Sequence, residues 1–304
     1  MALVGDRRVT EREGQTFRGE SLFVSYINLV KLPHTLFALP FALLGVVLAS
    51  YRSSVTLAQL GAVAVAFTAA RFFAMGFNRI ADRDLDALNP RTRQRELPTG
   101  RIALREAWIA VIVAAALFVA AAGWLNRLCL ILSPVALAWL GLYSYSKRWT
   151  HWSHLWLGIS LASAPVGGYL AITGQWSDSR SLLLIATAVA TWVAGFDIFY
   201  ALQDQAFDRS HGLKSAVVRL GESRAILAAK LLHGVTIVAL VGFGVAAGLS
   251  GWYFGGVALA AGLLAWEHQL VRPGDLKRLD AAFFLMNGII SIVVFFGALL
   301  DRVL

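Results

Sequence analysis

Residues 61–77 read GAVAVAFTAARFFAMGF, and residues 78–100 continue as NRIADRDLDALNPRTRQRELPTG. The first segment is almost wholly apolar, whereas the second concentrates aspartate and arginine. An apolar helix of about 20 residues is long enough to cross the ~30 Å hydrocarbon core of a bilayer. The two segments therefore predict a membrane-spanning helix that ends in a densely charged surface loop.

Composition indicates that most of the chain follows this pattern. The 304 residues are 58% hydrophobic and only 15% charged, which is too apolar for a soluble domain. After a polar tail at residues 1–24, we predict one all-α integral membrane domain over residues 25–304 with nine transmembrane helices. These helices are expected at about 29–50, 56–78, 105–124, 128–146, 154–174, 181–203, 224–247, 252–270 and 281–300.

The lysines and arginines predict the orientation of the chain. Most of them lie in the N-terminal tail and in the loops after the second, fourth, sixth and eighth spans. Only Arg52, Arg127, Arg180 and Arg302 flank the opposite ends. Because cytoplasmic loops are enriched in basic residues, the N-terminus and these loops are predicted to face the cytoplasm, with the chain in the cytoplasmic (inner) membrane. The net charge of +9 is then a topology signal, so no nucleic-acid partner is expected.

Asn78, Asp82 and Asp86 follow one another at four-residue intervals. On a continuous helix they would form a single stripe at the membrane surface. A solvated helix end, in which Arg79 and Arg83 offset the two acids, is the simplest explanation of this stripe taken alone.

A second acid stripe follows the sixth predicted span. Asp204 and Asp208 are again four residues apart, and Asp197 and Tyr200 precede them on much the same helix face. Asp197 would lie about two turns deeper, where a carboxylate is costly and is therefore a candidate functional group. Both stripes run into basic loops that contain glycine. The positive-inside rule does not explain this weak repeat, because it requires no aspartates.

Two carboxylate stripes at a membrane surface suit one kind of chemistry. Mg²⁺ takes oxygen ligands and commonly bridges carboxylates to the phosphates of a substrate. Neighbouring arginines and lysines can bind the remaining phosphate oxygens, and breaking a C–O bond to a diphosphate requires that the developing charge be neutralised. The membrane setting suggests that the organic part of the substrate is a lipid. The residues therefore predict a Mg²⁺-dependent enzyme that acts on a lipid diphosphate.

NRIADRDLD at 78–86 resembles the NxxxDxxxD motif of the UbiA superfamily of intramembrane prenyltransferases. DIFYALQDQAFD at 197–208, followed by GLKS, resembles the second aspartate-rich motif of that superfamily. KLPHTLFALPFALLG at 31–45 and YSYSKRWTHWSHLWLG at 143–158 are similar to members that act in quinone biosynthesis. The resemblance implies nine helices in a ring around a central cavity, with a cytoplasmic cap formed by the loops after spans 2 and 6. It also implies Mg²⁺-dependent transfer of a polyprenyl group from its diphosphate to an aromatic ring.

The resemblance assigns roles to individual residues. The expected metal ligands are Asn78, Asp82, Asp86, Asp204 and Asp208. The expected substrate-binding residues are Asn78, Lys31, His34, Tyr143, Ser144, Lys147, Arg148 and Tyr200. Their depth in the predicted membrane makes Asp197 and Arg71 the expected catalytic residues. Asp197 would accept the phenol proton or orient the phenol, and Arg71 would pair with Asp197 or with a bound anion, either the diphosphate or an acceptor carboxylate. Phe77 and Tyr200 are expected to face the allylic cation.

Simpler explanations stay open for some of these residues. Asp197 could serve only as a structural hydrogen-bonding group, and Lys147 and Arg148 could be topology anchors. Glu267 and His268, near the end of the eighth predicted span, are expected at the membrane interface.

The acceptor is open between 4-hydroxybenzoate and 1,4-dihydroxy-6-naphthoate, in ubiquinone or menaquinone biosynthesis, or another acceptor of the superfamily. The expected ligands are thus a polyprenyl diphosphate and a small aromatic acid, within the lipid bilayer and with no obligate protein partner. An ion-coupled transporter, from a different class, would also place Asp and Arg in the membrane. Most of the acids, however, lie at the predicted cytoplasmic ends. An alcohol phosphotransferase would use paired aspartates, but the DG and AR dipeptides of its motif are absent.

Overall fold

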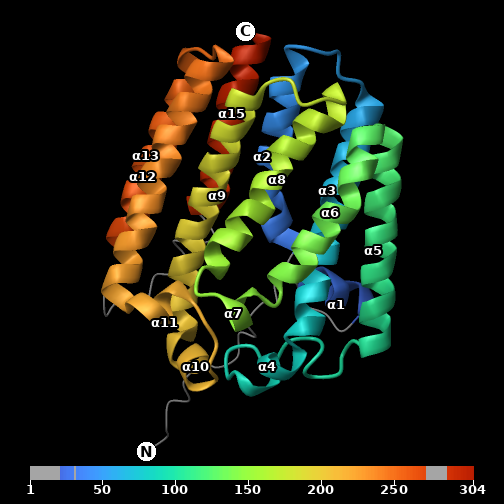
Figure 1. The fold of residues 1–304 in the computed structure, drawn as a ribbon, viewed down its shortest axis with the longest axis vertical. Helices are drawn as coiled ribbons and strands as arrows, with labels where there is room; N and C mark the ends of the chain where they lie inside the picture. Colours follow the sequence, from blue (N-terminus) through green and yellow to red (C-terminus); the bar gives the residue numbers. More distant parts are fainter. Residues whose placement is uncertain (1–20, 31, 272–285) are drawn as a thin grey trace, which may run out of the picture.

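The computed structural model describes residues 21–30, 32–271 and 286–304, and all regular structure within these ranges is helical. The long helices are α2 (Leu32–Ser50), α3 (Leu57–Ala81), α5 (Leu104–Leu125), α6 (Arg127–Tyr143), α8 (Ser153–Thr173), α9 (Ser179–Ala201), α12 (Glu222–Ala247), α13 (Gly251–Leu270) and α15 (Asn287–Val303). The short ones are α1 (Leu22–Leu29), α4 (Arg83–Leu88), α7 (Ser146–Trp149), η2 (Leu202–Asp204), α10 (Gln205–Ser210) and α11 (Ala216–Leu220). In Figure 1 the long helices run along the long axis of the molecule, and α4, α10 and α11 lie at its lower end.

The lengths of the helices confirm that this is an all-α integral membrane protein. Within the described residues, five helical stretches are long and apolar enough to cross a bilayer: Leu57–Ala81, Leu104–Leu125, Ser153–Thr173, Ser179–Ser210 and Glu222–Ala247. Ala38–Ser50 and Arg127–Tyr143 are shorter apolar helical stretches. The count of nine spans, the cytoplasmic N-terminus and the cap remain predictions, as does the division at residue 24. Residues 281–285 of the last predicted span lie outside the described residues.

Helices α2, α8 and α9 form the centre of the bundle. Helix α8 packs against both α2 and α9, α9 also packs against α12, and α15 packs against α2 and α13. Glycine permits the close approach of α2 and α8. A Cβ atom at Gly45 would lie only 1.9 Å from the carbonyl oxygen of Pro165, and one at Gly168 only 2.1 Å from that of Ala42. Small residues are typical of helix contacts within a bilayer, because packing there depends on backbone proximity.

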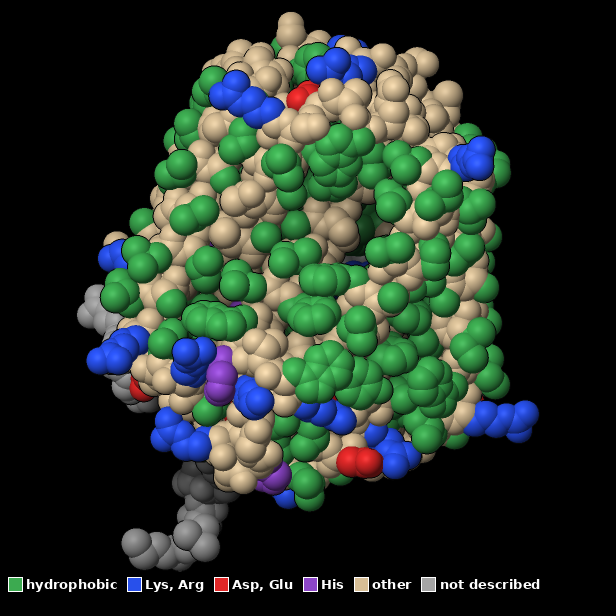
Figure 2. All heavy atoms as spheres, in the orientation of Figure 1, with side chains coloured by type: hydrophobic (Ala, Val, Ile, Leu, Met, Phe, Trp, Pro, Cys, Tyr) green, Lys and Arg blue, Asp and Glu red, His purple; other side chains and the backbone are tan. Residues whose placement is uncertain are grey.

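The outer surface also has the character of a membrane protein. Hydrophobic side chains cover most of the face seen in Figure 2, and lysine and arginine gather mainly along its lower rim. A hollow opens in this face between the hydrophobic side chains, above the middle of the view. Exposed tryptophans occur at or near the helix ends, as is typical of membrane interfaces. They include Trp124, Trp149, Trp152, Trp176 and Trp252.

The backbone corrects the prediction that each acid stripe lies on one continuous helix. Helix α3 ends at Ala81, and Asp82, with φ −99° and ψ 6°, joins it to α4. Asn78 and Asp86 therefore belong to different helices. The 3₁₀ turn η2 similarly separates α9 from α10. Each break redirects the chain within its acid motif, so the spacing of four residues does not correspond to one straight helical face.

Glu267 is buried, so the expectation of a membrane interface is wrong for this residue. Its side chain is among the least exposed in the protein, at 1% for the residue. Asn287 of α15 donates from Nδ2 to Glu267 Oε1 at 3.2 Å, and Trp192 Nε1 donates to Asn287 Oδ1 at 2.8 Å. These bonds join α9, α13 and α15 in the interior of the bundle.

Candidate active site

A cavity of about 540 Å³ lies inside the bundle. Long helices α2, α3, α6, α8 and α9 supply much of its wall, and further lining residues come from α5, α15, the short helices α4, α7, η2 and α10 and the loop after α4. Apolar side chains, among them Phe67, Leu161 and Trp192, line much of the wall between the long helices. The four aspartates of the two predicted metal stripes all line the cavity. The structure therefore brings both acid motifs to one space.

The first acid motif is held by hydrogen bonds and by cations. Asn78 Nδ2 donates to Asp82 Oδ2 at 2.9 Å, and Arg148 Nη2 lies 3.5 Å from the other oxygen of Asp82. Arg95 Nη1 donates to Asp86 Oδ1 at 2.7 Å; Asp86 is buried and Arg95 is partly buried. Burial, followed by the nearby carboxylate of Asp86, raises the pKa of Asp82 above its ordinary value, although neighbouring cations oppose the shift.

The second acid motif is tied to the loop that follows the first. Arg91 Nε donates to Asp204 Oδ1 at 2.8 Å, and its Nη2 contacts Oδ2 in a bidentate pair. Asn89 Nδ2 donates to the same Oδ1 at 3.1 Å. Arg91 Nη1 also donates to the hydroxyl of Tyr200 at 2.8 Å. Residues 89–91, which follow α4, thus cross the end of the cavity and hold η2.

Lys147 lies on α7, between the two motifs. Its Nζ is 3.7 Å from Asp208 Oδ2. Burial alone would lower the pKa of Lys147, but the surrounding carboxylates, of which Asp208 acts most strongly, raise it. The ammonium group is therefore charged at neutral pH. The structure places Lys147 where it can bind an anion next to both acid motifs.

Several buried polar atoms of the cavity wall have no hydrogen-bond partner among the described residues. They are Asp86 Oδ2, Asp208 Oδ2, Ser144 Oγ and Ser146 Oγ. Buried polar atoms are rarely left unbonded unless a ligand, ion or water serves them. Because all four residues line the same cavity as the two acid motifs, these atoms mark it as a ligand site.

The donor set fits Mg²⁺ in its chemistry. The carboxylates and the amide of Asn78 are hard oxygen donors, which Mg²⁺ prefers, and two carboxylate oxygens are buried without a hydrogen bond. Across the described ranges, however, no three His, Cys, Asp or Glu side chains converge as in a preformed metal site. The acids instead pair with Arg91, Arg95, Lys147 and Arg148. Such a site is suited to a metal that arrives with a phosphate substrate, since Mg²⁺ usually binds through a few carboxylates and substrate phosphates.

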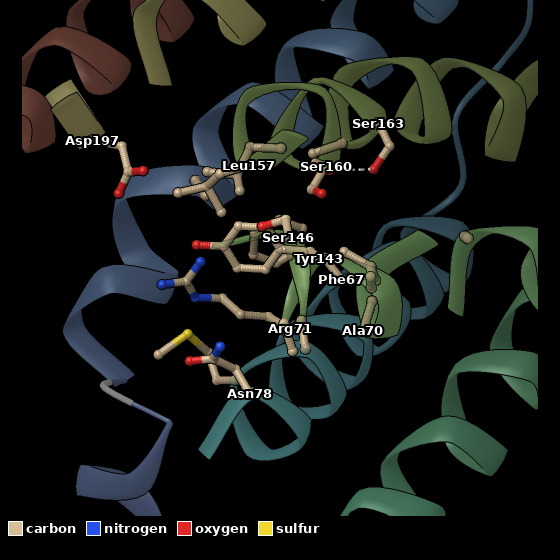
Figure 3. Close-up of a pocket in the computed structure, with 18 of the residues that line it drawn as sticks. Phe67, Ala70, Arg71, Asn78, Tyr143, Ser146, Leu157, Ser160, Ser163 and Asp197 are labelled. Carbon is tan, nitrogen blue, oxygen red and sulfur yellow. Dashed lines mark hydrogen bonds between the residues drawn. The ribbon is translucent and has the colours of Figure 1, made fainter. Parts of the chain in front are cut away.

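Arg71, Tyr143 and Asp197 line another part of the same cavity. Figure 3 shows the side chains of Arg71 and Tyr143 extending in the same direction, toward the side on which Asp197 lies. Asp197 Oδ2 is 2.6 Å from Nδ1 of His154, near the start of α8. The structure therefore gives Asp197 a hydrogen-bond partner on the neighbouring helix α8.

The structure also shows where the sequence-based site was incomplete or incorrect. Phe77 is absent from the cavity wall and packs against Trp108 and Tyr145, so the prediction that it faces the cation is wrong. Lys31 lies outside the described residues, and of His34 only its place in α2 is described. All other predicted site residues line the cavity.

Three residues escaped individual assignment from the sequence. In the sequence, Arg91 and Arg95 are two of several arginines in the loop after the first acid motif, but in the structure each binds an aspartate of an acid motif. The sequence assigns no role to His154. The only sequence signal for it is a histidine at the start of an apolar span, which does not identify a partner 43 residues away.

Comparisons with known proteins match this fold and these motifs. The UbiA prenyltransferase family profile matches residues 38–289. The chain is 33% identical over 227 residues, 74% of its length, to a 4-hydroxybenzoate octaprenyltransferase from Alkalilimnicola ehrlichii, of which 75% is covered. It is 32% identical over 229 residues, 75% of its length, to a protein of the same name from Pseudomonas fluorescens, with 75% of that protein covered.

Solved structures share the fold. The apo structure of a UbiA homolog from Aeropyrum pernix K1 has a TM-score of 0.80 and 37% identity, covering 88% of this chain and 98% of that one. A UbiA homolog from Archaeoglobus fulgidus bound to GPP and Mg²⁺ has a TM-score of 0.68 at 20% identity, covering 92% of this chain and 100% of that one. On the matched profile, the relatives and the shared fold, the chain belongs to the UbiA prenyltransferase family.

Proposed function

We propose that this protein transfers a polyprenyl group from its diphosphate to a ring carbon of a small aromatic hydroxy acid. One observation carries the proposal: both acid motifs line a single cavity that also has an apolar wall and an Arg–Asp set, Arg71 and Asp197. The acid end suits a metal-bound diphosphate, and the apolar wall suits a prenyl chain. The relatives named 4-hydroxybenzoate octaprenyltransferase support an aromatic acid as the acceptor.

The diphosphate would bind between the two acid motifs. Asn78, Asp82 and Asp86 on one side, with Asp204 and Asp208 on the other, would hold Mg²⁺, which when bound neutralises the charge that collects on the leaving diphosphate. Lys147 is held charged by its acidic neighbours and lies 3.7 Å from Asp208, so it would contact diphosphate oxygens directly. Ser144 and Ser146 line the same cavity as Lys147, and their hydroxyls, which have no hydrogen-bond partner among the described residues, are further donors for the diphosphate.

The residues on the other part of the cavity suit the acceptor. The guanidinium of Arg71 would bind the acceptor carboxylate, because planar donors pair well with carboxylates. Asp197 would accept the phenol proton, or hold that hydroxyl, so that the ring carbon beside it faces the donor. Tyr200 would present its ring to the allylic cation, and Arg91 fixes the position of its hydroxyl at 2.8 Å.

The proposed prenyl transfer breaks two bonds, one in the donor and one in the acceptor, and forms one C–C bond between them. The C–O bond of the donor breaks, and the diphosphate leaves with the electron pair. The ring carbon next to the hydroxyl forms a C–C bond to the allylic carbon, and the ring loses the proton from that carbon to restore aromaticity. The products are the prenylated acid, diphosphate and one proton.

The test is product formation by purified protein in lipid nanodiscs. The protein is incubated with Mg²⁺ and a polyprenyl diphosphate, with either 4-hydroxybenzoate or 1,4-dihydroxy-6-naphthoate, and products are identified by mass spectrometry. One acid is expected to gain the mass of the prenyl group less one hydrogen, and only with Mg²⁺. Absence of a prenylated product with either acid, from protein that is folded by size-exclusion chromatography, would contradict the proposed acceptor class.

A further inference from the structure

His154 connects Asp197 to the segment that follows α10. The imidazole is buried, with 1% exposure. On one side its Nδ1 is 2.6 Å from Asp197 Oδ2. On the other side, the backbone N–H of Ala216, the first residue of α11, donates to His154 Nε2 at 3.3 Å. The ring therefore bridges a cavity carboxylate and a backbone amide on a different element.

These two bonds assign the proton on the imidazole. A backbone N–H can only donate, so the Nε2 atom that it faces must be an unprotonated acceptor. In a neutral imidazole the other nitrogen then carries the hydrogen. His154 thus donates from Nδ1 to the carboxylate of Asp197. This arrangement leaves the second oxygen of Asp197 for a ligand in the cavity that Asp197 lines.

The segment that fixes His154 is itself anchored. Ser215 caps α11, with its Oγ accepting from the backbone N–H of Val218 at 3.1 Å. The carbonyl oxygen of Ser215 lies 3.3 Å from Nδ1 of His151. One residue earlier, the backbone N–H of Lys214 donates to the carbonyl oxygen of Lys147 at 2.7 Å. His154 is thus held by a segment that also contacts the lysine next to Asp208.

We propose that His154 is a positioning residue for prenyl transfer, which acts by holding Asp197 in one orientation toward the acceptor. The inference rests on the proposed function, in which Asp197 serves the acceptor. His154 itself does not touch the substrate and does not exchange a proton. Its role requires only a hydrogen-bond donor toward Asp197 and a hydrogen-bond acceptor toward the backbone N–H of Ala216.

This requirement makes the glutamine variant informative. The amide of His154→Gln offers both an N–H donor and a carbonyl acceptor but does not titrate. We expect it to keep kcat within about threefold of the wild type. His154→Leu has neither group, so kcat should fall about 10- to 100-fold, the range for loss of a hydrogen bond to a charged group. The KM of the prenyl diphosphate should change less than about threefold in both, because His154 acts on the acceptor side.

A matched control separates this role from a loss of structure. His151→Leu removes the other histidine contact to the same segment, yet His151 has no hydrogen bond to Asp197. Its kcat should stay within about threefold of the wild type. If the leucine variant of His154 fails to fold, His154→Asn replaces it. Its shorter amide can donate to Asp197 but does not reach Ala216, so its kcat should fall below that of the glutamine variant.

A double-mutant cycle gives the decisive comparison. In an Asp197→Asn background, His154→Leu should cause no further loss of kcat beyond about threefold. Full multiplication of the two losses would overturn the proposal. The proposal would also be overturned if kcat of His154→Gln fell as far as kcat of His154→Leu. If His154→Leu does not fold, the same comparison is made with His154→Asn. If the wild-type protein makes no prenylated acid, the proposed function fails instead, so the two failures are distinguishable.

Discussion

Replacing Asp197 by asparagine separates binding of the donor from chemistry at the acceptor. The carboxylate lies on α9, seven residues before Asp204, which lies in η2 after the end of that helix. Asparagine keeps the shape of the side chain, and its Oδ1 can still accept the hydrogen bond from His154. The substitution therefore removes the negative charge and the ability to take a proton while preserving the local packing.

The expected effect on catalysis is large, and the effect on folding is small. A positioned general base contributes about 10²- to 10⁴-fold to a rate, so kcat for Asp197→Asn should fall by that factor. The hydrogen bond from His154 loses only its charge assistance, worth about 1 kcal/mol. Donor affinity should change less than about threefold, because Asp197 lies in α9, before the break that leads into the second acid motif, and a magnesium diphosphate carries partly cancelling charges.

The assay combines steady-state kinetics, donor affinity and melting temperature for the one variant. Asp204→Asn is the matched control, since it makes the same chemical change at the diphosphate end. There the Mg²⁺-dependent affinity for the donor should fall as well as kcat. An Asp197→Asn enzyme with kcat within threefold of the wild type would refute a catalytic role for Asp197. Equal losses of donor affinity in both variants would instead place Asp197 with the metal ligands.

Three further predictions concern the metal, the topology and the packing. Asp86→Asn and Asp208→Asn should each reduce turnover more than about 100-fold while the protein remains folded, and EDTA should abolish turnover reversibly with Mg²⁺; wild-type turnover in EDTA would contradict this. A reporter fused after residue 175 should be extracytoplasmic and one inserted near residue 95 cytoplasmic, as the distribution of basic residues predicts; finding both on one side would contradict the span count. Gly45→Leu should destabilise the protein by about 1–3 kcal/mol or prevent folding, because a Cβ there would lie 1.9 Å from a carbonyl oxygen of α8; an unchanged melting temperature would show that the two helices separate at little cost.

The sequence predicts the helices well because the length of an apolar stretch is itself a physical requirement of the bilayer. The predicted spans up to residue 270 agree with the observed helices to within a few residues. The acid motifs were also predictable, since neither burial nor membrane topology explains aspartates at these positions. Their convergence on one cavity is confirmed by the structure.

The breaks within the acid motifs could not be read from the local sequence. The carbonyl oxygen of Ala81, at the end of α3, accepts a hydrogen bond from Arg148 Nη2 at 2.7 Å. That contact joins residues 67 positions apart. Local helix propensity contains no information about it, so a continuous helix was the natural prediction.

The pairing of charges was likewise hidden. Arg91 reaches Asp204 across 113 residues, and His154 reaches Asp197 across 43. In the sequence, Arg91 is one of several arginines in a basic loop, and topology alone accounts for such a loop. Only the folded arrangement distinguishes the arginines that hold an aspartate from those that mark the membrane surface.

An experimental structure with Mg²⁺ and an unreactive prenyl thiodiphosphate tests the assignment of the cavity most directly. The diphosphate and its metal should lie between the pair Asp82 and Asp86 and the pair Asp204 and Asp208, with the prenyl chain along the apolar wall. The first prenyl carbon should point toward the space between Arg71 and Asp197. A diphosphate bound outside the two acid motifs, or a prenyl chain outside this cavity, would contradict the assignment.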